Sequence, residues 1–338
     1  MLTWTEPFHP QINLEASSHF AQILLHLAAG GATITTLLGF AGSLWWIFEL
    51  MEHFRPQYCL ILVVAIVIGG ISRQAWCFIW CVPLALNLAL ILPLFFTSAQ
   101  VQSAPNNTLR ILHANLDHDN QDTTQAIEYI KSQKLDLVLL QEVTAKWLNA
   151  IQSNLSQYQI IKSLPLENSQ GWTMLLPVKP SQPFEVVATQ IIKLPAYSNR
   201  PLLEIIIRWK NKEVAILSFS VARPNQSNFQ AVEFNEAAQW SQRQQKENKR
   251  EVIIIGDFNS TPWSSRFRKF QQDSNLRNSQ RGFGLQPTWN TSLPPVLMIA
   301  IDHCLHSQSI TTINRNIGSN IGSDHLPLVV ELSKLSAI

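Results

Sequence analysis

The sequence predicts a domain of the α/β class after about residue 108, preceded by a helical region inserted in a membrane. Two aliphatic runs, DLVLL at 136–140 and EVIIIG at 251–256, are typical of strands that helices cover on both faces. Other short β runs alternate with amphipathic helical segments, and three long apolar stretches occupy the first hundred residues. These observations predict layers of helix packed on a β-sheet behind a membrane anchor.

The apolar stretches predict about three transmembrane helices, near residues 30–50, 57–73 and 76–97. A helix needs about 20 apolar residues to cross the hydrocarbon core. The first and third stretches meet this length, and the second is short but almost purely aliphatic. The segment 19–30 fits either an interfacial helix or an extension of the first span. A cleaved signal peptide fits less well, because the apolar region is far too long for one. We therefore expect an integral membrane protein.

Charge is divided unevenly between the two parts of the chain. Only Arg55 and Arg73 of the 25 basic residues, and four of the 23 acidic residues, precede residue 101. The remainder is mildly basic and lacks the dense basic stripe of a non-specific DNA-binding protein. The two arginines lie in successive connections between the predicted spans, so the positive-inside rule leaves the orientation open. Three spans would place the two termini on opposite sides of the membrane.

The domain organisation expected is a membrane anchor over 1–97, a polar linker over 98–108 and a single large domain over 109–338. Cys304 is the only cysteine after the anchor, so no disulfide can form within that domain. Strands are predicted at Leu109–Leu116, Leu135–Gln141, Leu202–Trp209, Val214–Ser220, Val252–Gly256 and Leu328–Glu331. Helices are predicted at 122–133, 144–155, 227–247 and 263–273.

Acids, amides and a histidine stand at the ends of several predicted strands, beside the loops where sites are usually built. Each has an ordinary explanation as a helix cap or turn former. Their joint occurrence in these positions instead favours one shared site. The candidates are Asn115, Glu142, Asp257, Asn259, Asp302, Asp324 and His325.

These residue types suit the hydrolysis of a phosphate ester, in which water attacks phosphorus while negative charge grows on the surrounding oxygens. Glu142 is the natural carboxylate ligand for a hard divalent cation, with Asn115 orienting the metal or the phosphate. Asp257 can orient the water or the leaving group, and Asn259 can donate to a phosphate oxygen. His325, polarised by a carboxylate, can act as a general base or as a donor to the phosphate.

The series HANL, LLQEV, GDFN, PTW, IDH and SDHLP resembles the endonuclease/exonuclease/phosphatase superfamily, and most closely its bacterial members with apolar N-terminal spans. The resemblance covers roughly residues 108–334. It implies a four-layer α/β sandwich of two mixed sheets flanked by helices, with a site at one end that uses Mg²⁺ or Mn²⁺. It also implies a location in the bacterial inner membrane.

The motifs of the superfamily carry over to individual positions. Asn115 and Glu142 match metal-site residues, and Asp257 and Asn259 match the pair of the GDFN motif. The closing Asp-His pair and its partner acid are matched by Asp324, His325 and Asp302. Trp289 resembles an aromatic near the substrate mouth, although a core tryptophan explains it equally well.

One feature departs from the pattern of the superfamily. Many members carry a second histidine after a strand, where this chain has Ser218, Phe219 and Ser220. Losing a general acid typically costs about 10²–10⁴-fold in rate. Arg223 can compensate by binding phosphate, and Glu204 is expected to face solvent from its strand.

Three functions follow from these observations. The leading one is a membrane-anchored, metal-dependent hydrolase of phosphate esters, whose substrate is a phospholipid, a nucleotide-linked headgroup or a nucleic acid. The missing histidine raises the alternative of a binding module that recognises a phosphate-containing ligand. A membrane scaffold or transporter is disfavoured, because the predicted spans carry almost no ionisable residue at their centres. No protein partner can be inferred.

Overall fold

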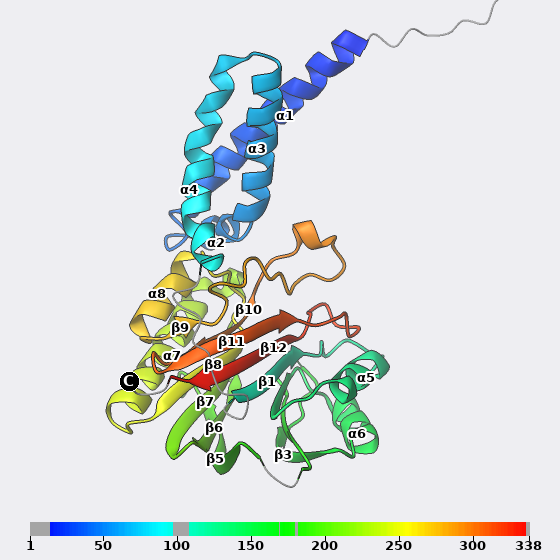
Figure 1. The fold of residues 1–338 in the computed structure, drawn as a ribbon, viewed down its shortest axis with the longest axis vertical. Helices are drawn as coiled ribbons and strands as arrows, with labels where there is room; N and C mark the ends of the chain where they lie inside the picture. Colours follow the sequence, from blue (N-terminus) through cyan, green and yellow to red (C-terminus); the bar gives the residue numbers. More distant parts are fainter. Residues whose placement is uncertain (1–13, 97–107, 169, 180–181, 336–338) are drawn as a thin grey trace, which may run out of the picture.

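A computed structural model of the chain describes residues 14–96, 108–168, 170–179 and 182–335. It shows a bundle of helices standing on a sandwich of two β-sheets (Figure 1). The predicted linker falls outside the described residues apart from Thr108, which begins the first strand.

The bundle consists of three long helical segments and a short helix at its base. Helix α1 covers Leu14–Gly39 and α3 covers Arg55–Ile71. The 3₁₀ helix η1 (Ala75–Trp80) runs into α4 (Cys81–Ile91) and η2 (Leu92–Leu94). The short α2 (Trp46–Glu52) precedes α3 and is bent from it by 60°.

Two segments of the bundle, His19–Gly39 and Ala75–Leu94, are long and apolar enough to cross a membrane, and α2 with α3 makes a third if the bent pair is one span. The first segment lies nearer the N-terminus than the span predicted near residues 30–50. Helix α1 continues through Gly30 and Gly31 because leucines and alanines, which are strong helix formers, flank that pair. It ends at Gly39, and the turn that follows packs against α2: a side chain at Gly42 would collide with Glu52.

The sandwich contains two six-stranded sheets. The first has the order β11-β12-β1-β2-β4-β3 and the second β5-β6-β7-β8-β10-β9. The first sheet comprises β1 (Thr108–Asn115), β2 (Leu137–Gln141), β3 (Tyr158–Leu164), β4 (Trp172–Pro177), β11 (Ile310–Ile317) and β12 (Leu328–Lys334). The second comprises β5 (Phe184–Lys193), β6 (Pro201–Trp209), β7 (Lys212–Ser220), β8 (Glu251–Asp257), β9 (Arg277–Asn278) and β10 (Asp302–His306).

Helices cover the outer face of each sheet, which confirms the four-layer sandwich. Helices α5 (Thr124–Ser132) and α6 (Ala145–Asn154) pack on the first sheet, and α7 (Ser227–Lys246) and α8 (Ser265–Asp273) on the second. The central core lies between the two sheets, where aliphatic side chains such as Ile111 and Ile255 meet. Removing such chains from water is the main force that holds the layers together.

The strand register gathers the candidate residues at one end of the sandwich. Strands β1 and β2 run parallel with Asn115 opposite Gln141, so Glu142 follows next to Asn115. In the second sheet Asp257 pairs with Ser220 on one side and with Asp302 on the other.

The bundle is joined to the sandwich by hydrogen bonds as well as by apolar packing. The indole N–H of Trp263 donates to the backbone oxygen of Glu52 at 2.8 Å, and Nδ1 of His53 lies 3.0 Å from Oγ1 of Thr261. Arg266 forms a 2.7 Å ion pair with Glu49. Helix α2 is therefore fixed to the loop that follows the GDFN segment.

Candidate active site

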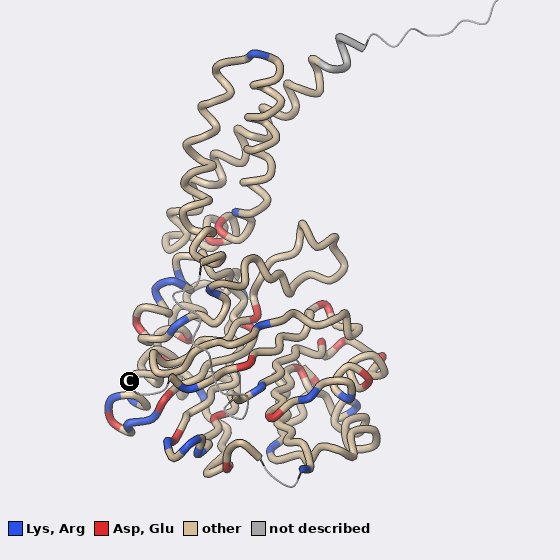
Figure 2. Tube along the Cα trace, viewed as in Figure 1, with Lys and Arg blue, Asp and Glu red and all other residues tan. Residues whose placement is uncertain are grey.

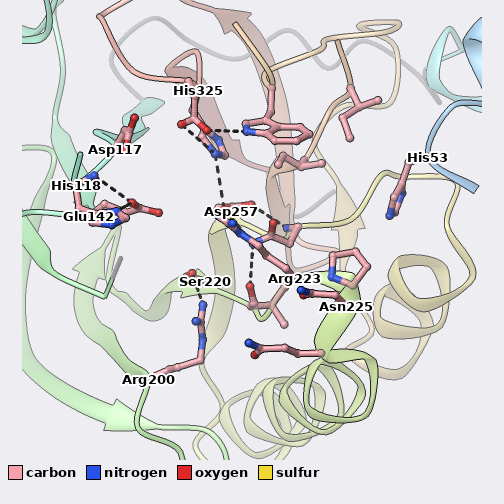
Figure 3. A pocket seen from close by; sticks show the side chains of 18 of the residues that line it. His53, Asp117, His118, Glu142, Arg200, Ser220, Arg223, Asn225, Asp257 and His325 are labelled. Carbon is pink, nitrogen blue, oxygen red and sulfur yellow. Dashed lines mark hydrogen bonds and ion pairs between the residues drawn. The ribbon is translucent and has the colours of Figure 1, made fainter. Parts of the chain in front are cut away.

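A pocket of about 710 Å³ opens at the end of the sandwich where the candidate residues converge. Its wall takes side chains from β7 and β8 of the second sheet, from loops that follow β1, β2 and β7 or precede β12, and from α2. Figure 3 shows Asp117, His118 and Glu142 on one side of the pocket, His53 on the other, and Asp257 and His325 between them.

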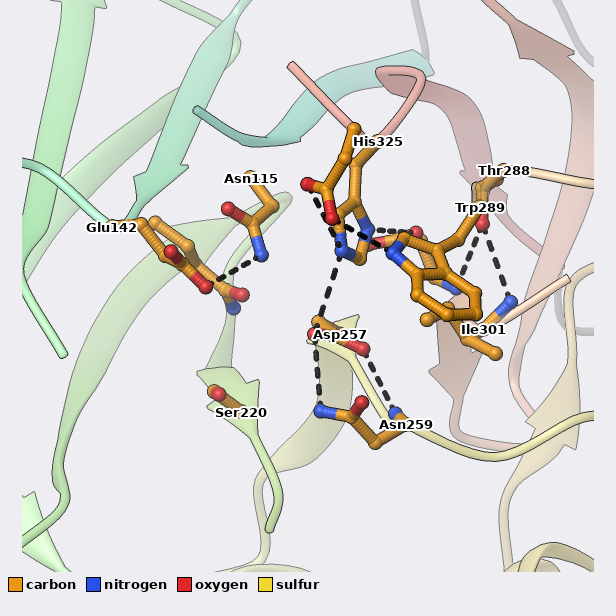
Figure 4. Close-up of polar contacts among 12 residues, drawn as sticks. Asn115, Glu142, Ser220, Asp257, Asn259, Thr288, Trp289, Ile301 and His325 are labelled. Atoms are coloured by element: carbon orange, nitrogen blue, oxygen red, sulfur yellow. Dashed lines mark hydrogen bonds and ion pairs between the residues drawn. The ribbon is translucent and has the colours of Figure 1, made fainter. Parts of the chain in front are cut away.

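Asp257 ends the buried strand β8 and faces the pocket. Its Oδ1 accepts the backbone N–H of Asn259 at 2.8 Å, and its Oδ2 accepts the Asn259 side-chain amide at 3.1 Å (Figure 4). The same amide nitrogen donates to the backbone oxygen of Val221 at 2.9 Å. Both amide hydrogens of Asn259 are thus used, so this residue holds Asp257 in place in this arrangement, whereas the sequence suggested a donor to phosphate.

His325 reaches the pocket from the loop before β12 and is held from behind by Asp302. Its Nδ1 lies 2.9 Å from Oδ2 of Asp302, while its Nε2 lies 4.0 Å from Oδ2 of Asp257. The other oxygen of Asp302 lies 3.0 Å from Nε2 of His113. Asp302 is fully buried and does not line the pocket. Among the predicted catalytic residues, it is therefore a positioning residue that acts through His325.

The protonation states follow from this network of buried charges. Burial alone would lower the pKa of His325, but the charges of Asp302 and Asp257 and the hydrogen bond to Asp302 raise it to about 10. Burial raises the pKa of Asp257 to about 7. Burial would also raise the pKa of Asp302, but the charge of His325 holds it well below its usual range. At neutral pH His325 is a cation, which suits a donor to phosphate and not a general base.

Glu142 lies at the start of the loop after β2, with a backbone φ of 59° in the left-handed region. Its Oε1 accepts the side-chain amide of Asn115 at 3.0 Å, and its Oε2 lies 2.7 Å from Nδ1 of His118. Burial would raise the pKa of Glu142, but the hydrogen bonds of His118 and Asn115 lower it. The carboxylate is thus ionised and oriented, with lone pairs left for a cation.

The neighbouring acids make this side of the pocket suitable for a divalent cation. Burial raises the pKa of Asp117, and the charges of Asp324 and Glu142 raise it further. Mutual repulsion of this kind is relieved when a cation binds between the carboxylates. Asp117 also has a left-handed backbone, with φ of 58°. Such strained conformations cluster at functional sites. Oxygen ligands of this type suit a hard divalent cation.

Trp289 and Asp324 form part of the pocket wall near His325. The indole N–H of Trp289 donates to Oδ2 of Asp324 at 2.8 Å, and Oδ1 of Asp324 lies 3.9 Å from Nε2 of His325. Trp289 also pairs with His325 through an isolated β-bridge. Of the two expectations for Trp289, the structure supports the aromatic at the mouth.

The end of β7 lacks the second histidine that many relatives carry. An arginine from the β5–β6 connection, Arg200, lies there instead. Ser220 lines the pocket, and Phe219 is buried in the core. The guanidinium of Arg200 donates to the hydroxyl of Ser220 at 3.0 Å and forms a 3.2 Å ion pair with Glu233. Arg223 also lines the pocket and is exposed. Two arginines therefore contribute positive charge to this side of the pocket.

Several members of the site were missed from the sequence. His113 and His118 flank Asn115 in the segment HANLDH, and this clustering of polar residues was the available signal. Arg200 lies in a loop with no motif, so only the fold brings it to Ser220. Glu204 was expected to face solvent, but it is buried beneath α7. The indole N–H of Trp240 in α7 donates a 2.6 Å hydrogen bond to its carboxylate.

Comparisons with known proteins agree with this architecture. The sequence profile of the Endonuclease/Exonuclease/phosphatase family matches residues 107–325. The structure of D. rerio TDP2 complexed with a single-stranded DNA product aligns with a TM-score of 0.55 and 15% identity, over 67% of this chain and 99% of that one. The human nocturnin catalytic domain with bound sulfate aligns with a TM-score of 0.54 and 18% identity, over 68% and 95%.

A bacterial member, the endonuclease/exonuclease/phosphatase from Bacteroides vulgatus, gives a TM-score of 0.54 and 16% identity over 68% of this chain and 99% of its own. No curated protein sequence matches the chain significantly. At these identities the solved structures support the fold alone. The profile match covers more than half of the chain and includes the segments of Asn115, Glu142, Asp257 and His325. The chain therefore belongs to the endonuclease/exonuclease/phosphatase family, whose members hydrolyse phosphate esters.

Proposed function

We propose that the protein is a divalent-metal-dependent hydrolase of phosphate esters, held in a membrane by its N-terminal helices. The observation that carries the proposal is the convergence of Glu142, Asp257 and a cationic His325 around one pocket. Glu142 and His325 are 183 positions apart along the chain (325 − 142). The packing of the two sheets alone does not require these side chains to meet. Acids with displaced pKa values in a cleft are typical of functional sites.

The residues of the pocket can divide the work of hydrolysis. In that reaction an oxygen of water bonds to phosphorus, the ester P–O bond breaks, and the departing oxygen takes up a proton. Asp257, whose pKa is raised to about 7, accepts the proton of the water. His325 donates from Nε2 to a non-bridging oxygen, and Arg200 and Arg223 face the phosphate on the side of β7. No oxidant or reductant is involved.

Glu142 and Asp117 would hold the cation, with Asn115 and His118 fixing the Glu142 carboxylate. When bound, a divalent cation neutralises charge on the phosphate oxygens and lowers the pKa of a bound water. Oxygen ligands favour Mg²⁺ or Mn²⁺ over softer metals.

Membrane insertion is supported by the composition of the bundle. Between residues 19 and 96 the charged residues are Glu49, Glu52 and Arg55, all near its base, and Arg73 at the opposite end of α3. Figure 2 shows the uncharged length between these two ends. The helices turn apolar side chains outward, including Leu37, Leu60 and Val67. We infer an integral membrane protein with α1, α3 and η1–α4 as its three spans and with the short α2 at the membrane surface before α3, consistent with the inner membrane of a bacterium.

The second candidate is a binding module that recognises a phosphate-containing ligand without turning it over. The segment Ser218–Ser220 at the end of β7 favours it, because it contains no histidine where many relatives carry one. Arg200, held by Glu233, would serve binding in either case.

The experiment that separates the two candidates is a turnover assay on the full-length chain in detergent. Soluble aryl phosphodiesters, aryl phosphomonoesters and single-stranded DNA are incubated with Mg²⁺, with Mn²⁺ and with EDTA. The hydrolase predicts turnover of at least one ester that EDTA abolishes and either metal restores. Saturable binding of the esters without turnover at high protein concentration identifies the binding module. Undiminished activity in EDTA contradicts the metal-dependent hydrolase.

A further inference from the structure

The active-site pocket shares a wall with the base of the helical bundle. Leu50 and His53, both from the segment between α1 and α3, line the same pocket as Asp257 and His325. His53 is fixed there by its contact with Thr261, and Trp263 anchors the backbone of Glu52. The membrane region is therefore a structural component of the site and not only a flexible tether.

The positions of Arg55 and Arg73 indicate how deep this wall of the pocket lies relative to the bilayer. Helix α3 has 17 residues between Arg55 and Ile71, and at 1.5 Å per residue it spans about 25 Å, close to the ~30 Å of a hydrocarbon core. Arg55, the first residue of the helix, is buried and donates to Asn87 of α4 at 2.9 Å, and the exposed Arg73 follows the end of the helix. Because charged groups are costly at the centre of a hydrocarbon core, the two ends of α3 would lie near its two surfaces. Helix α2, directly before Arg55, then lies at the level of the lipid headgroups.

A loop of the sandwich reaches the same level. The side-chain amide of Gln57, in the first turn of α3, donates to the backbone oxygens of Val296 and Met298 at 3.0 and 3.3 Å. Figure 1 shows this loop (orange) beside the lower end of the bundle, at the height of α2. The loop exposes three apolar side chains: Leu293 is 42%, Val296 56% and Leu297 46% exposed.

The loop is also continuous with the pocket. Trp289 and Ile299 pair across its two ends and both line the pocket wall. A group of exposed apolar side chains beside a pocket is typical of a surface that binds an apolar partner. The exposed surface of the bundle continues this apolar character at Leu44, Trp45 and Phe54, near its base. A lipid surface around the bundle would contact the apolar side chains of the loop and those at the base of the bundle together.

We propose that the pocket takes its substrate from the bilayer, as the phosphate ester of a membrane lipid, with the loop 291–297 seated among the lipid headgroups. The lipid phosphate would reach His325 and Asp257 past Leu50, while its apolar chains stay in the membrane. Hydrolysis adds the oxygen of water to phosphorus and releases the alcohol on the far side of the broken P–O bond. This inference rests on the proposed phosphate-ester hydrolase and on membrane insertion of the bundle.

The activity test compares two esters with the same reacting group in the full-length chain reconstituted in phosphatidylcholine vesicles. Hexadecyl 4-nitrophenyl phosphate is carried by the vesicles, and ethyl 4-nitrophenyl phosphate is soluble. We expect kcat/KM for the vesicle-borne ester to be about ten-fold or more higher. In the double variant V296D/L297D this advantage is lost, while the rate on the soluble ester stays unchanged. Val178→Asp, which changes a 65% exposed valine in the segment after β4, is the matched control and alters neither rate.

Equal or faster hydrolysis of the soluble ester or of single-stranded DNA by the wild-type chain overturns the inference. So does a double variant that keeps its full advantage on the vesicle-borne ester.

A second readout separates failure of this inference from failure of the proposed hydrolase. An environment-sensitive fluorophore is attached at Leu297→Cys, or at Val178→Cys as control, in a chain whose two accessible cysteines, Cys59 and Cys81, are alanine. Lipid contact predicts blue-shifted emission at position 297 that spin-labelled lipids quench, and water-like emission at 178. Water-like emission at both positions contradicts the lipid surface, whatever the enzyme hydrolyses. Without turnover of either ester, the hydrolase fails while this readout still tests the surface.

Discussion

Oδ2 of the buried Asp302 lies 2.9 Å from Nδ1 of His325, and this contact leaves Nε2 of His325 facing the pocket. The pair joins β10 of one sheet to the loop before β12 of the other, so the charge of His325 depends on the packing of the two sheets. A carboxylate in this position fixes the orientation of the imidazole and stabilises its protonated form.

Replacing Asp302 by asparagine is expected to act on both stability and protonation. The change leaves His325 without its counter-charge in a buried site, which typically costs about 3–5 kcal/mol of unfolding free energy. It also lowers the pKa of His325, so the alkaline limb of the activity profile moves to lower pH. If Asp302 had only a structural role, Asp302→Asn would lower the stability and leave the alkaline limb of the pH profile unchanged. Denaturant titration and pH profiles of kcat/KM measure the two effects.

Activity is expected to have a bell-shaped dependence on pH. Asp257 must lose its proton to accept one from water, so kcat/KM rises as pH passes about 7. His325 must keep its proton to donate to the phosphate, so kcat/KM falls as pH passes about 10. Stopped assays from about pH 5 to about pH 11, a range that extends at least ~1 unit beyond each limb, test this. A profile that is flat between about 6 and 8 is inconsistent with Asp257 as the acceptor.

The raised pKa of His325 also predicts how stability varies with pH. Because the pKa in the folded chain, about 10, lies above the ordinary value of 6.5, the pairing with Asp302 stabilises the fold fully below about 6.5. This contribution is lost as pH rises through about 10. The unfolding free energy of the wild type should therefore fall towards pH 10, and that of His325→Ala should fall less.

Replacing Glu142 by glutamine should weaken metal binding at the site and have a smaller effect on the stability of the fold. The amide keeps the shape and can still contact Asn115, but it removes the negative charge that a divalent cation needs. We expect the Mg²⁺ concentration for half-maximal activity to rise about ten-fold or more. Asp273→Asn, in the exposed part of α8, removes a charge elsewhere and serves as the control. An unchanged Mg²⁺ dependence places the metal elsewhere.

Arg200 is expected to contribute to substrate binding at the position where many relatives carry histidine. Its guanidinium is held between Ser220 and Glu233, so Arg200→Lys keeps the charge but loses the planar fork. We expect Arg200→Lys and Arg200→Ala both to lower kcat/KM, the latter by about ten-fold or more. Full activity in Arg200→Ala would leave Arg223 as the phosphate ligand on this side.

Much of the fold could be predicted from the sequence, because its buried strands and amphipathic helices have clear patterns. The strands around Ile111, Leu139 and Ile254 and the four flanking helices match the prediction to within a few residues. Strands β3, β4, β5, β9, β10 and β11 were missed. The exposure pattern of β3, β5 and β11 is mixed, and all six strands are defined by pairing with their neighbours. A local sequence pattern does not show which strands pair, because the paired strands can be far apart in the sequence.

The candidate site could be predicted where a functional side chain directly follows a buried strand, as at Glu142 and Asp257. Residues that enter through long-range contacts could not. His113 is one buried polar residue within β1, and only the position of β10 gives it Asp302 as a partner. Arg200 needs the β5–β6 hairpin to place it beside Ser220. The wall formed by Leu50 and His53 depends on how the bundle sits on the sandwich.

The most direct test of the central claim is hydrolysis of a soluble aryl phosphodiester in ¹⁸O-labelled water by the full-length chain with Mg²⁺. We predict that one labelled oxygen appears on the phosphate product, and that Asp257→Asn and His325→Ala each slow the reaction by about 10²-fold or more. Label in the alcohol, or turnover undiminished in both variants, would contradict attack of water on phosphorus at this pocket.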